Sequence, residues 1–378
     1  MKLAFQLFYI VILSVSPDAM AQQPSLIDAN ATPETKNLWL NLHRLAGKNI
    51  LFGHQHALEY GHGWVGEPGM SDVKKVTGSH PAVIGIDVSA FSGKMDANYE
   101  KTRNDLVKIA KQTYDGGGVV TISWHARNPV DGGGFYYKDS TTPKAVPQII
   151  PGGAYHAQYK SMLKQVAEFA LQAKGSDGKQ IPMIFRPFHE YDGNWFWWGA
   201  GHCSKEEFVQ LWRFTVTYLR DSLQVHNFIY AFSPDCLFLT EAALMERFPG
   251  KDWVDMIGMD NYADFGRDGK YNVAAGLKKL TIIQAVADRF QKLSAFTETG
   301  LESIPNNTWW TETLLKTVMQ PGLKLSYVLV WRNDSKSTTH YYAPFPGHSS
   351  VPDFIKFYEH PFTLFENDLK DLYKPLSK

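Results

Sequence analysis

The sequence predicts a (β/α)8 barrel, the TIM-barrel fold, and two observations support this. Short apolar segments recur along the chain, and stretches with helical periodicity lie between them. The apolar segments are nearly continuous instead of alternating with polar residues, which is typical of parallel strands buried on both faces. Such strands close most simply into a barrel with helices outside. An open doubly wound sheet is the alternative, but no GxGxxG or GxxxxGK sequence follows a strand.

The expected elements follow in chain order. A first helix begins at Thr32-Pro33-Glu34, because Thr is a good N-cap and Pro is favoured in the first turn. Segments rich in β-branched and aromatic residues predict strands at 50–54, 82–88, 118–125, 182–189, 227–233, 254–260, 293–298 and 325–331. Helices are expected at 100–114, 155–173, 204–222, 280–292 and 308–319. Ser204 and Glu207 have the spacing of a capping box at the start of the third.

The first 21 residues have the pattern of a secretory signal peptide. Lys2 supplies a positive charge, residues 3–15 are largely apolar, and Ala19-Met20-Ala21 is a small-x-small cleavage sequence. This run is too short to span a bilayer, and no later segment is expected to span one. We therefore expect export to the periplasm or the extracellular space. Residues 22–378 are expected to form one catalytic barrel domain.

Composition narrows the possible partners. The 378 residues include 38 basic and 38 acidic side chains, so zero net charge gives no reason to expect nucleic acid or an anionic membrane as partner. Aromatic residues make up 14% of the chain, which suits a protein that stacks sugar rings, although most of them are expected in the core. Cys203 and Cys236 form a possible disulfide or remain two thiols. We expect a monomer.

Charged residues gather where the expected strands end, which is the catalytic face of a (β/α)8 barrel. Glu190 follows the fourth strand and Glu298 ends the seventh, so the two carboxylates lie across the barrel mouth from each other. Cleavage of a glycosidic bond needs such a pair, one as acid and one as nucleophile or base. Arg186 and Arg332 are candidates to keep a nucleophile ionised.

Aromatic residues surround this pair. The segment 186–199 reads RPFHEYDGNWFWWG and holds three Trp residues. Sugars bind through their CH faces on such rings. The candidate platforms are Trp195, Trp197, Trp198, Trp124, Tyr262 and Trp331. At least one Trp of the WFWW run is expected only to pack the loop.

These stretches together resemble glycoside hydrolase family 26. The resemblance rests on RPFHE with NWFWWG, on WHARNP and AFTETG, and on ILFGHQ and HPFTLFENDL near the two ends, and it extends from about Asn37 to Leu369. It implies a retaining β-1,4-mannanase with Glu190 as acid/base and Glu298 as nucleophile. It also implies that His125, Arg186, His189, Trp195, Tyr262, Trp331 and Arg332 lie at or beside the sugar site. Trp198, Trp124, Asp260 and His54 are further candidates for this site.

The implied substrates are mannan, glucomannan or galactomannan and their oligosaccharides, with neither metal nor organic cofactor. The insertion Val130–Pro151 could wall off the cleft, so mid-chain cutting and mannobiose release both stay open. β-1,3-Xylan and mixed-linkage β-glucan are alternative substrates. Two other classes are weighed: a barrel metal hydrolase, for which His54-x-His56 with His125 and His189 is an incomplete ligand set, and a sugar-binding protein, which would not need two opposed carboxylates.

Overall fold

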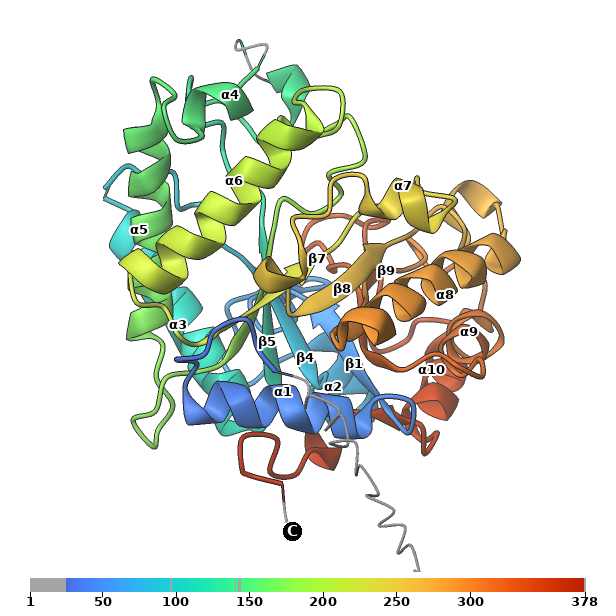
Figure 1. Cartoon of the computed structure of the whole chain (residues 1–378). Helices are drawn as coiled ribbons and strands as arrows, with labels where there is room; N and C mark the ends of the chain where they lie inside the picture. Colours follow the sequence, from blue (N-terminus) through green and yellow to red (C-terminus); the bar gives the residue numbers. More distant parts are fainter. Residues whose placement is uncertain (1–24, 96, 140, 142–143, 377–378) are drawn as a thin grey trace, which may run out of the picture.

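The computed structural model describes residues 25–95, 97–139, 141 and 144–376, so the expected signal peptide lies outside it. Eight parallel strands close into a barrel with helices around it, which confirms the predicted fold (Figure 1). They are β1 (Ile50–Gln55), β4 (Val83–Asp87), β5 (Val119–Trp124), β6 (Met183–Pro187), β7 (Phe228–Phe232), β8 (Met256–Asp260), β9 (Leu293–Thr299) and β10 (Leu325–Val330). Pairing of β10 with β1 closes the barrel, with Leu51 opposite Tyr327.

Burial explains why these segments are strands. Every residue of the eight is buried except Asp87, which is half-buried at the end of β4. A strand that is buried on both faces does not alternate apolar with polar residues, so its sequence is a nearly continuous apolar run. These apolar runs are the signal that predicted the strands. All eight expected segments are confirmed. Three short strands lie outside the barrel proper: β2 (Tyr60–Gly61), β3 (Trp64–Val65) and β11 (Thr363–Leu364), which pairs with β1.

The helices cover the barrel. They are α1 (Pro33–Leu45), α2 (Asp72–Thr77), α3 (Tyr99–Asp115), α4 (Val146–Ile149), α5 (His156–Gln172), α6 (Lys205–Thr217), α7 (Glu241–Met245), α8 (Val273–Phe290), α9 (Lys316–Val318) and α10 (Val351–Tyr358). Two π-helices, η2 (Tyr218–Ser222) and η5 (Trp309–Leu315), adjoin α6 and α9. The capping box is present at Ser204 and Glu207. None of the helices in the described ranges is long and apolar enough to cross a membrane.

One end of the barrel is plugged by α1, which lies across the base of the sheet in Figure 1. Leu38, Trp39 and Leu42 pack with side chains at the first positions of the barrel strands. Asn41 donates from its amide to the carbonyl oxygens of Leu372 (3.0 Å) and Lys374 (2.9 Å), so the C-terminal segment is part of the same plug. The opposite end, where the strands finish, is left for the functional loops.

Candidate active site

A pocket of about 320 Å³ opens where the barrel strands end. It holds both glutamates that the sequence singled out, Glu190 and Glu298. The strand ends β5, β6, β8, β9 and β10 therefore meet at one place, as the barrel prediction required. The other lining residues are His125, Tyr136, His189, Trp195, Phe196, Asp235, Tyr262, Arg267, Trp331, His340 and Tyr342.

Glu298 lies in β9 and is held by two donors. The guanidinium of Arg186 contacts one carboxylate oxygen through Nη2, and the Tyr262 hydroxyl donates to the other at 3.0 Å. Arg186 is itself buried in β6, where its Nη1 donates to both oxygens of Asp260 at 3.1 Å and to Ser233 Oγ at 2.9 Å. Both oxygens of the Glu298 carboxylate are therefore fixed in position by donors. This is the arrangement that a nucleophile needs, because the attacking atom must be held toward the substrate.

Glu190 follows β6 on backbone in the left-handed region, with φ of 54°. Its Oε2 accepts one hydrogen bond, from Nε1 of Trp195 at 2.6 Å. Burial raises the pKa of the Glu190 carboxyl well above its usual value. Nearby carboxylates raise this pKa further, and they belong to Glu298, Asp260 and Asp235. A carboxyl group in such surroundings keeps its proton toward neutral pH and can act as a general acid.

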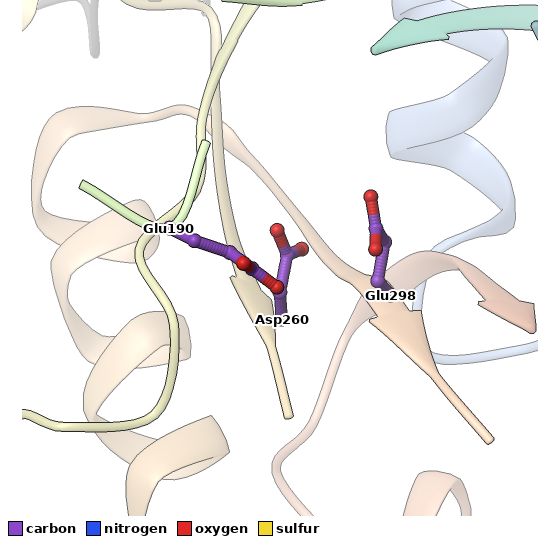
Figure 2. Close-up of side chains that lie close together, drawn as sticks. All are labelled: Glu190, Asp260 and Glu298. Carbon is purple, nitrogen blue, oxygen red and sulfur yellow. The ribbon is translucent and has the colours of Figure 1, made fainter. Parts of the chain in front are cut away.

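The two glutamates face each other at short range. One oxygen each from Glu190, Asp260 and Glu298 lie within 4.8 Å of one another, and Figure 2 shows the three side chains gathered at the ends of their elements. A separation near 5 Å suits direct attack on a sugar carbon by one carboxylate while the other protonates the leaving oxygen.

The same three carboxylates are the one set of potential metal ligands that the described ranges bring together. Arg186 already donates to two of them, so its guanidinium supplies the positive charge there. The histidines of the metal-hydrolase alternative are not part of such a set: His56 contacts Glu59 instead. The donor geometry therefore does not favour that alternative.

A pair of histidines lies beside Glu190. His125 Nδ1 contacts Asp87 Oδ2 at 2.6 Å, and its Nε2 lies 3.2 Å from Nε2 of His189. Burial lowers the pKa of His189 well below its usual value, and the charges of His125 and Arg186 lower it further. His189 is therefore neutral at ordinary pH. Asp87, at the end of β4, braces His125 and is not among the residues that line the pocket.

The aromatic candidates divide into two groups. Trp195, Tyr262 and Trp331 line the pocket. Trp124 and Trp198 do not, because both are fully buried and so have no face free for a sugar. Trp124 packs against Tyr159 of α5 and the rings of Phe185 and Phe188. Trp198 donates its N–H to the His189 carbonyl at 2.9 Å, and Trp197 donates to Ala126 at 2.7 Å. Their function is to fix the loop that carries Glu190.

Other predicted residues lie outside the pocket lining. Arg186 and Asp260 are both buried: Arg186 holds Glu298, and Asp260 accepts hydrogen bonds from Arg186. His54 is 1% exposed in β1, and burial lowers its pKa to about 4. Arg332 donates to Asp334 at 2.8 Å, and its guanidinium lies 5.9 Å from the centre of the Tyr60 ring. It is not among the residues that line the pocket.

The two cysteines are free thiols. Cys203 and Cys236 are both buried, and the possible disulfide is not formed. The Cys203 thiol donates to the Trp198 carbonyl at 3.6 Å, whereas the Cys236 thiol donates to the Asp235 carboxylate at 3.5 Å. Each thiol therefore has a separate local acceptor.

Several lining residues were not singled out by the sequence. Asp235 lies three residues past the end of β7 (Phe228–Phe232), so its place near a strand end was an available signal. The others lie inside loops, where the distance in sequence from a strand does not tell which way a side chain points. They are Tyr136, Phe196, Arg267, His340 and Tyr342.

The site combines a parallel (β/α)8 barrel with two opposed glutamates at its mouth, Glu298 buried and held by Arg186, and Glu190 half-buried among acids. This is the form of a glycoside hydrolase. Residues 27–311 match the model of glycosyl hydrolase family 26. The chain belongs to this family, which confirms the resemblance.

Relatives in this family support the match. The chain is 32% identical to a mannan endo-1,4-β-mannosidase of Bifidobacterium adolescentis, an alignment that covers 88% of this chain and 34% of that protein. It spans 51% of a second such relative, from Caldalkalibacillus mannanilyticus, at 26% identity over 69% of this chain. The chain thus covers about a third and a half of the length of these two proteins.

Solved structures agree in fold over most of both chains. GH26C from Muricauda sp. MAR_2010_75 superposes with a TM-score of 0.88 at 35% identity, covering 93% of this chain and 96% of that one. A GH26 β-mannanase from Bacteroides ovatus gives a TM-score of 0.84 at 40% identity, with 91% and 98% covered.

Proposed function

We propose that this chain is a retaining β-1,4-mannanase that cleaves mannan, glucomannan or galactomannan. The observation that carries the proposal is the contrast between Glu298, held by Arg186 and Tyr262, and Glu190, buried among anions within 4.8 Å of it. Relatives named mannan endo-1,4-β-mannosidase support the choice of substrate.

The first step forms a bond between the enzyme and the sugar. An oxygen of ionised Glu298 attacks the anomeric carbon, and the glycosidic C–O bond breaks. Glu190 gives its proton to the departing oxygen, which leaves as a hydroxyl of the shortened chain. Arg186 and Tyr262 orient the attacking carboxylate, while Trp195 keeps Glu190 in place through its N–H.

The second step reverses the roles. Once Glu298 is esterified it carries no charge, so one of the anions that raise the pKa of Glu190 disappears. Glu190, now ionised, takes a proton from water as the water oxygen attacks the anomeric carbon, and Glu298 leaves as a carboxylate. Two displacements at one carbon restore the starting configuration. The change in charge at Glu298 thus supports the change of Glu190 from acid to base.

The export expected from residues 1–21 remains part of the proposal, as do both modes of action. Tyr136 brings the insertion 130–151 to the rim of the pocket, which supports a role for that segment in limiting the cleft. β-1,3-Xylan and mixed-linkage β-glucan remain the alternative substrates.

Time-resolved chromatography of products from linear β-1,4-mannan tests the proposal, with xylan and mixed-linkage glucan in parallel. A spread of oligosaccharides is expected for mid-chain cutting, and mannobiose alone for a blocked cleft. Cleavage of another glycan but not mannan would contradict the substrate. Proton NMR of the first product is expected to give the β-anomer, and the α-anomer would contradict retention.

A further inference from the structure

The insertion 130–151 is hydrogen-bonded to the loop that follows β6 and carries Glu190. Its residues 135–137 run antiparallel to residues 195–197 of that loop. The Tyr137 N–H donates to the Trp195 carbonyl oxygen at 2.7 Å, and a second backbone bond of 3.3 Å runs in the opposite direction two residues along. The backbone of Trp195 is therefore held from outside its own loop.

An aromatic stack strengthens the same connection. The Tyr137 ring lies flat on the imidazole of His202, with the two centroids 3.4 Å apart and the two planes 12° from parallel. His202 belongs to the loop after β6, and its Nε2 donates to the Asn194 carbonyl oxygen at 2.8 Å. Tyr137 thus contacts this loop at the backbone of Trp195 and at the ring of His202. We call Tyr137 and His202 the clasp.

The clasp is next to the one side chain of the loop that reaches the acid. Nε1 of Trp195 donates to Glu190 Oε2 at 2.6 Å. The Trp195 ring is half-buried and packs over Gly193, where a Cβ would lie 2.3 Å from the ring. Because ring contacts cover this side chain only in part, the direction of its N–H depends on where its backbone is held. The Tyr137 N–H is a contact that holds this backbone.

The two members of the clasp lie outside the catalytic pocket. Neither Tyr137 nor His202 is among the residues that line it, whereas the neighbouring Tyr136 is. A substitution at Tyr137 can therefore change the position of Trp195 without removing a side chain from the pocket lining.

We propose that Tyr137 is a positioning residue for proton transfer: together with His202 it holds the Trp195 backbone, so that the indole N–H stays directed at Glu190. This inference rests on the proposed function, because it takes Glu190 to be the acid. A donor aimed at a carboxyl group orients that group toward the departing oxygen and stabilises its ionised form. The insertion 130–151 then fixes the acid, whether or not it also limits the cleft.

The test compares two variants on two substrates. Tyr137→Ala removes the stack, whereas Tyr137→Phe keeps the ring and is the matched control. Linear β-1,4-mannan needs a proton on its departing oxygen, and a dinitrophenyl β-mannobioside does not. We expect Tyr137→Ala to lower kcat/KM on mannan about tenfold, which is part of the roughly 10²- to 10⁴-fold that general acid catalysis contributes. Its release of dinitrophenol should stay within about twofold of the wild type, and Tyr137→Phe should match the wild type on both substrates.

The pH profile is a readout that a merely structural role would not move. The carboxylates that face Glu190 are unchanged in both variants, and they belong to Glu298, Asp260 and Asp235. The hydrogen bond from Trp195 lowers the pKa of Glu190, so loss of this donor raises that pKa. The alkaline limb of kcat/KM on mannan should therefore move to higher pH in Tyr137→Ala. A limb that stays in place or moves to lower pH would contradict the inference.

A second variant separates the clasp from a general loosening of the insertion. His202→Ala breaks the stack from the side of the loop, and it should give the same selective loss on mannan. The double variant with Tyr137→Ala should lose no more than either single variant, because the two rings act as one unit. Additive losses would count against the clasp, and so would equal losses on both substrates. Thermal melts establish that each variant is folded at the assay temperature.

The outcomes distinguish this inference from the proposed function. Wild-type rates for Tyr137→Ala on mannan would overturn the inference while the proposed function stands. A loss in Glu190→Gln that is equal on both substrates would remove the acid role, and both proposals would then fail.

Discussion

The ends of β6 and β9 present the same side chain in opposite surroundings. Glu298 at β9 is part of a buried strand and contacts a cation and a phenol. Glu190 follows β6 on left-handed backbone, and its carboxyl group accepts from Trp195 and lies among carboxylates. The difference teaches that the surroundings, not the residue type, divide the work of an acid from that of a nucleophile.

Replacement of the β9 glutamate is the strongest test of this contrast. Glu298→Gln keeps the shape but removes the attacking oxygen anion, so we expect kcat to fall about 10⁴-fold or more. Initial rates on mannan measure the loss, and calorimetry with manno-oligosaccharides is expected to show that binding persists. Residual activity within tenfold of the wild type would assign the nucleophile elsewhere.

Replacement of the β6 glutamate should give a loss that depends on the substrate. Glu190→Gln cannot protonate the departing oxygen, so kcat/KM on mannan is expected to fall by roughly 10²- to 10⁴-fold. A dinitrophenyl mannoside needs no such proton, and its first step should be far less affected. Stopped-flow release of dinitrophenol measures that step. An equal loss on both substrates would contradict the acid role.

The contacts of Glu298 provide a milder test. Tyr262→Phe removes one hydrogen bond to the carboxylate, and we expect kcat to fall on the order of 10- to 100-fold. Tyr342→Phe is the matched control, since that ring borders the same pocket and no hydrogen bond from its hydroxyl to Glu298 is found among the described residues. Similar kinetics for the two variants would argue against a role for the Tyr262 hydroxyl.

The smallest expected effect is on pH dependence. Asp235→Asn removes an anion that raises the pKa of Glu190, so Glu190 should lose its proton at lower pH and the alkaline limb of kcat/KM should move down. Trp195→Phe removes a donor that stabilises ionised Glu190, so its pKa should rise and the limb should move up. Profiles of kcat/KM against pH measure both shifts. Shifts in one common direction would contradict this account of Glu190.

The barrel could be predicted because burial on both faces requires a nearly continuous run of apolar residues in each strand. The helices were harder to predict from the sequence. Helix α8 begins at Val273, before the expected 280, and the short α2 and α10 were not expected. A helix of six or eight residues shows too few turns for a period to be recognised. Short helices that are stabilised by tertiary packing therefore could not be predicted from the sequence pattern.

Predictions of site residues succeeded where the sequence indicates the direction of the side chain, and failed where it does not. Glu190 and Glu298 could be predicted from the sequence because each lies at the end of a strand whose order in the barrel was known. Trp195 and Trp198 were not separable, since both belong to the same loop and only the fold turns one to the pocket and the other to the core. Arg267 begins the short 3-10 helix η4 (Arg267–Gly269), a segment of three residues that leaves no periodic pattern in the sequence.

The plug at the base of the barrel has a practical consequence. The segment around Leu372 is bound to α1, which lies across the base of the barrel (Figure 1), whereas the pocket lies where the strands end. A resin or a fused module joined through the C-terminus would thus face away from the mouth. Immobilised in this orientation, the protein would keep its pocket facing the solution, where a long polysaccharide can reach it. Removal of the segment around Leu372 would delete its contacts with α1 and so destabilise the base of the barrel.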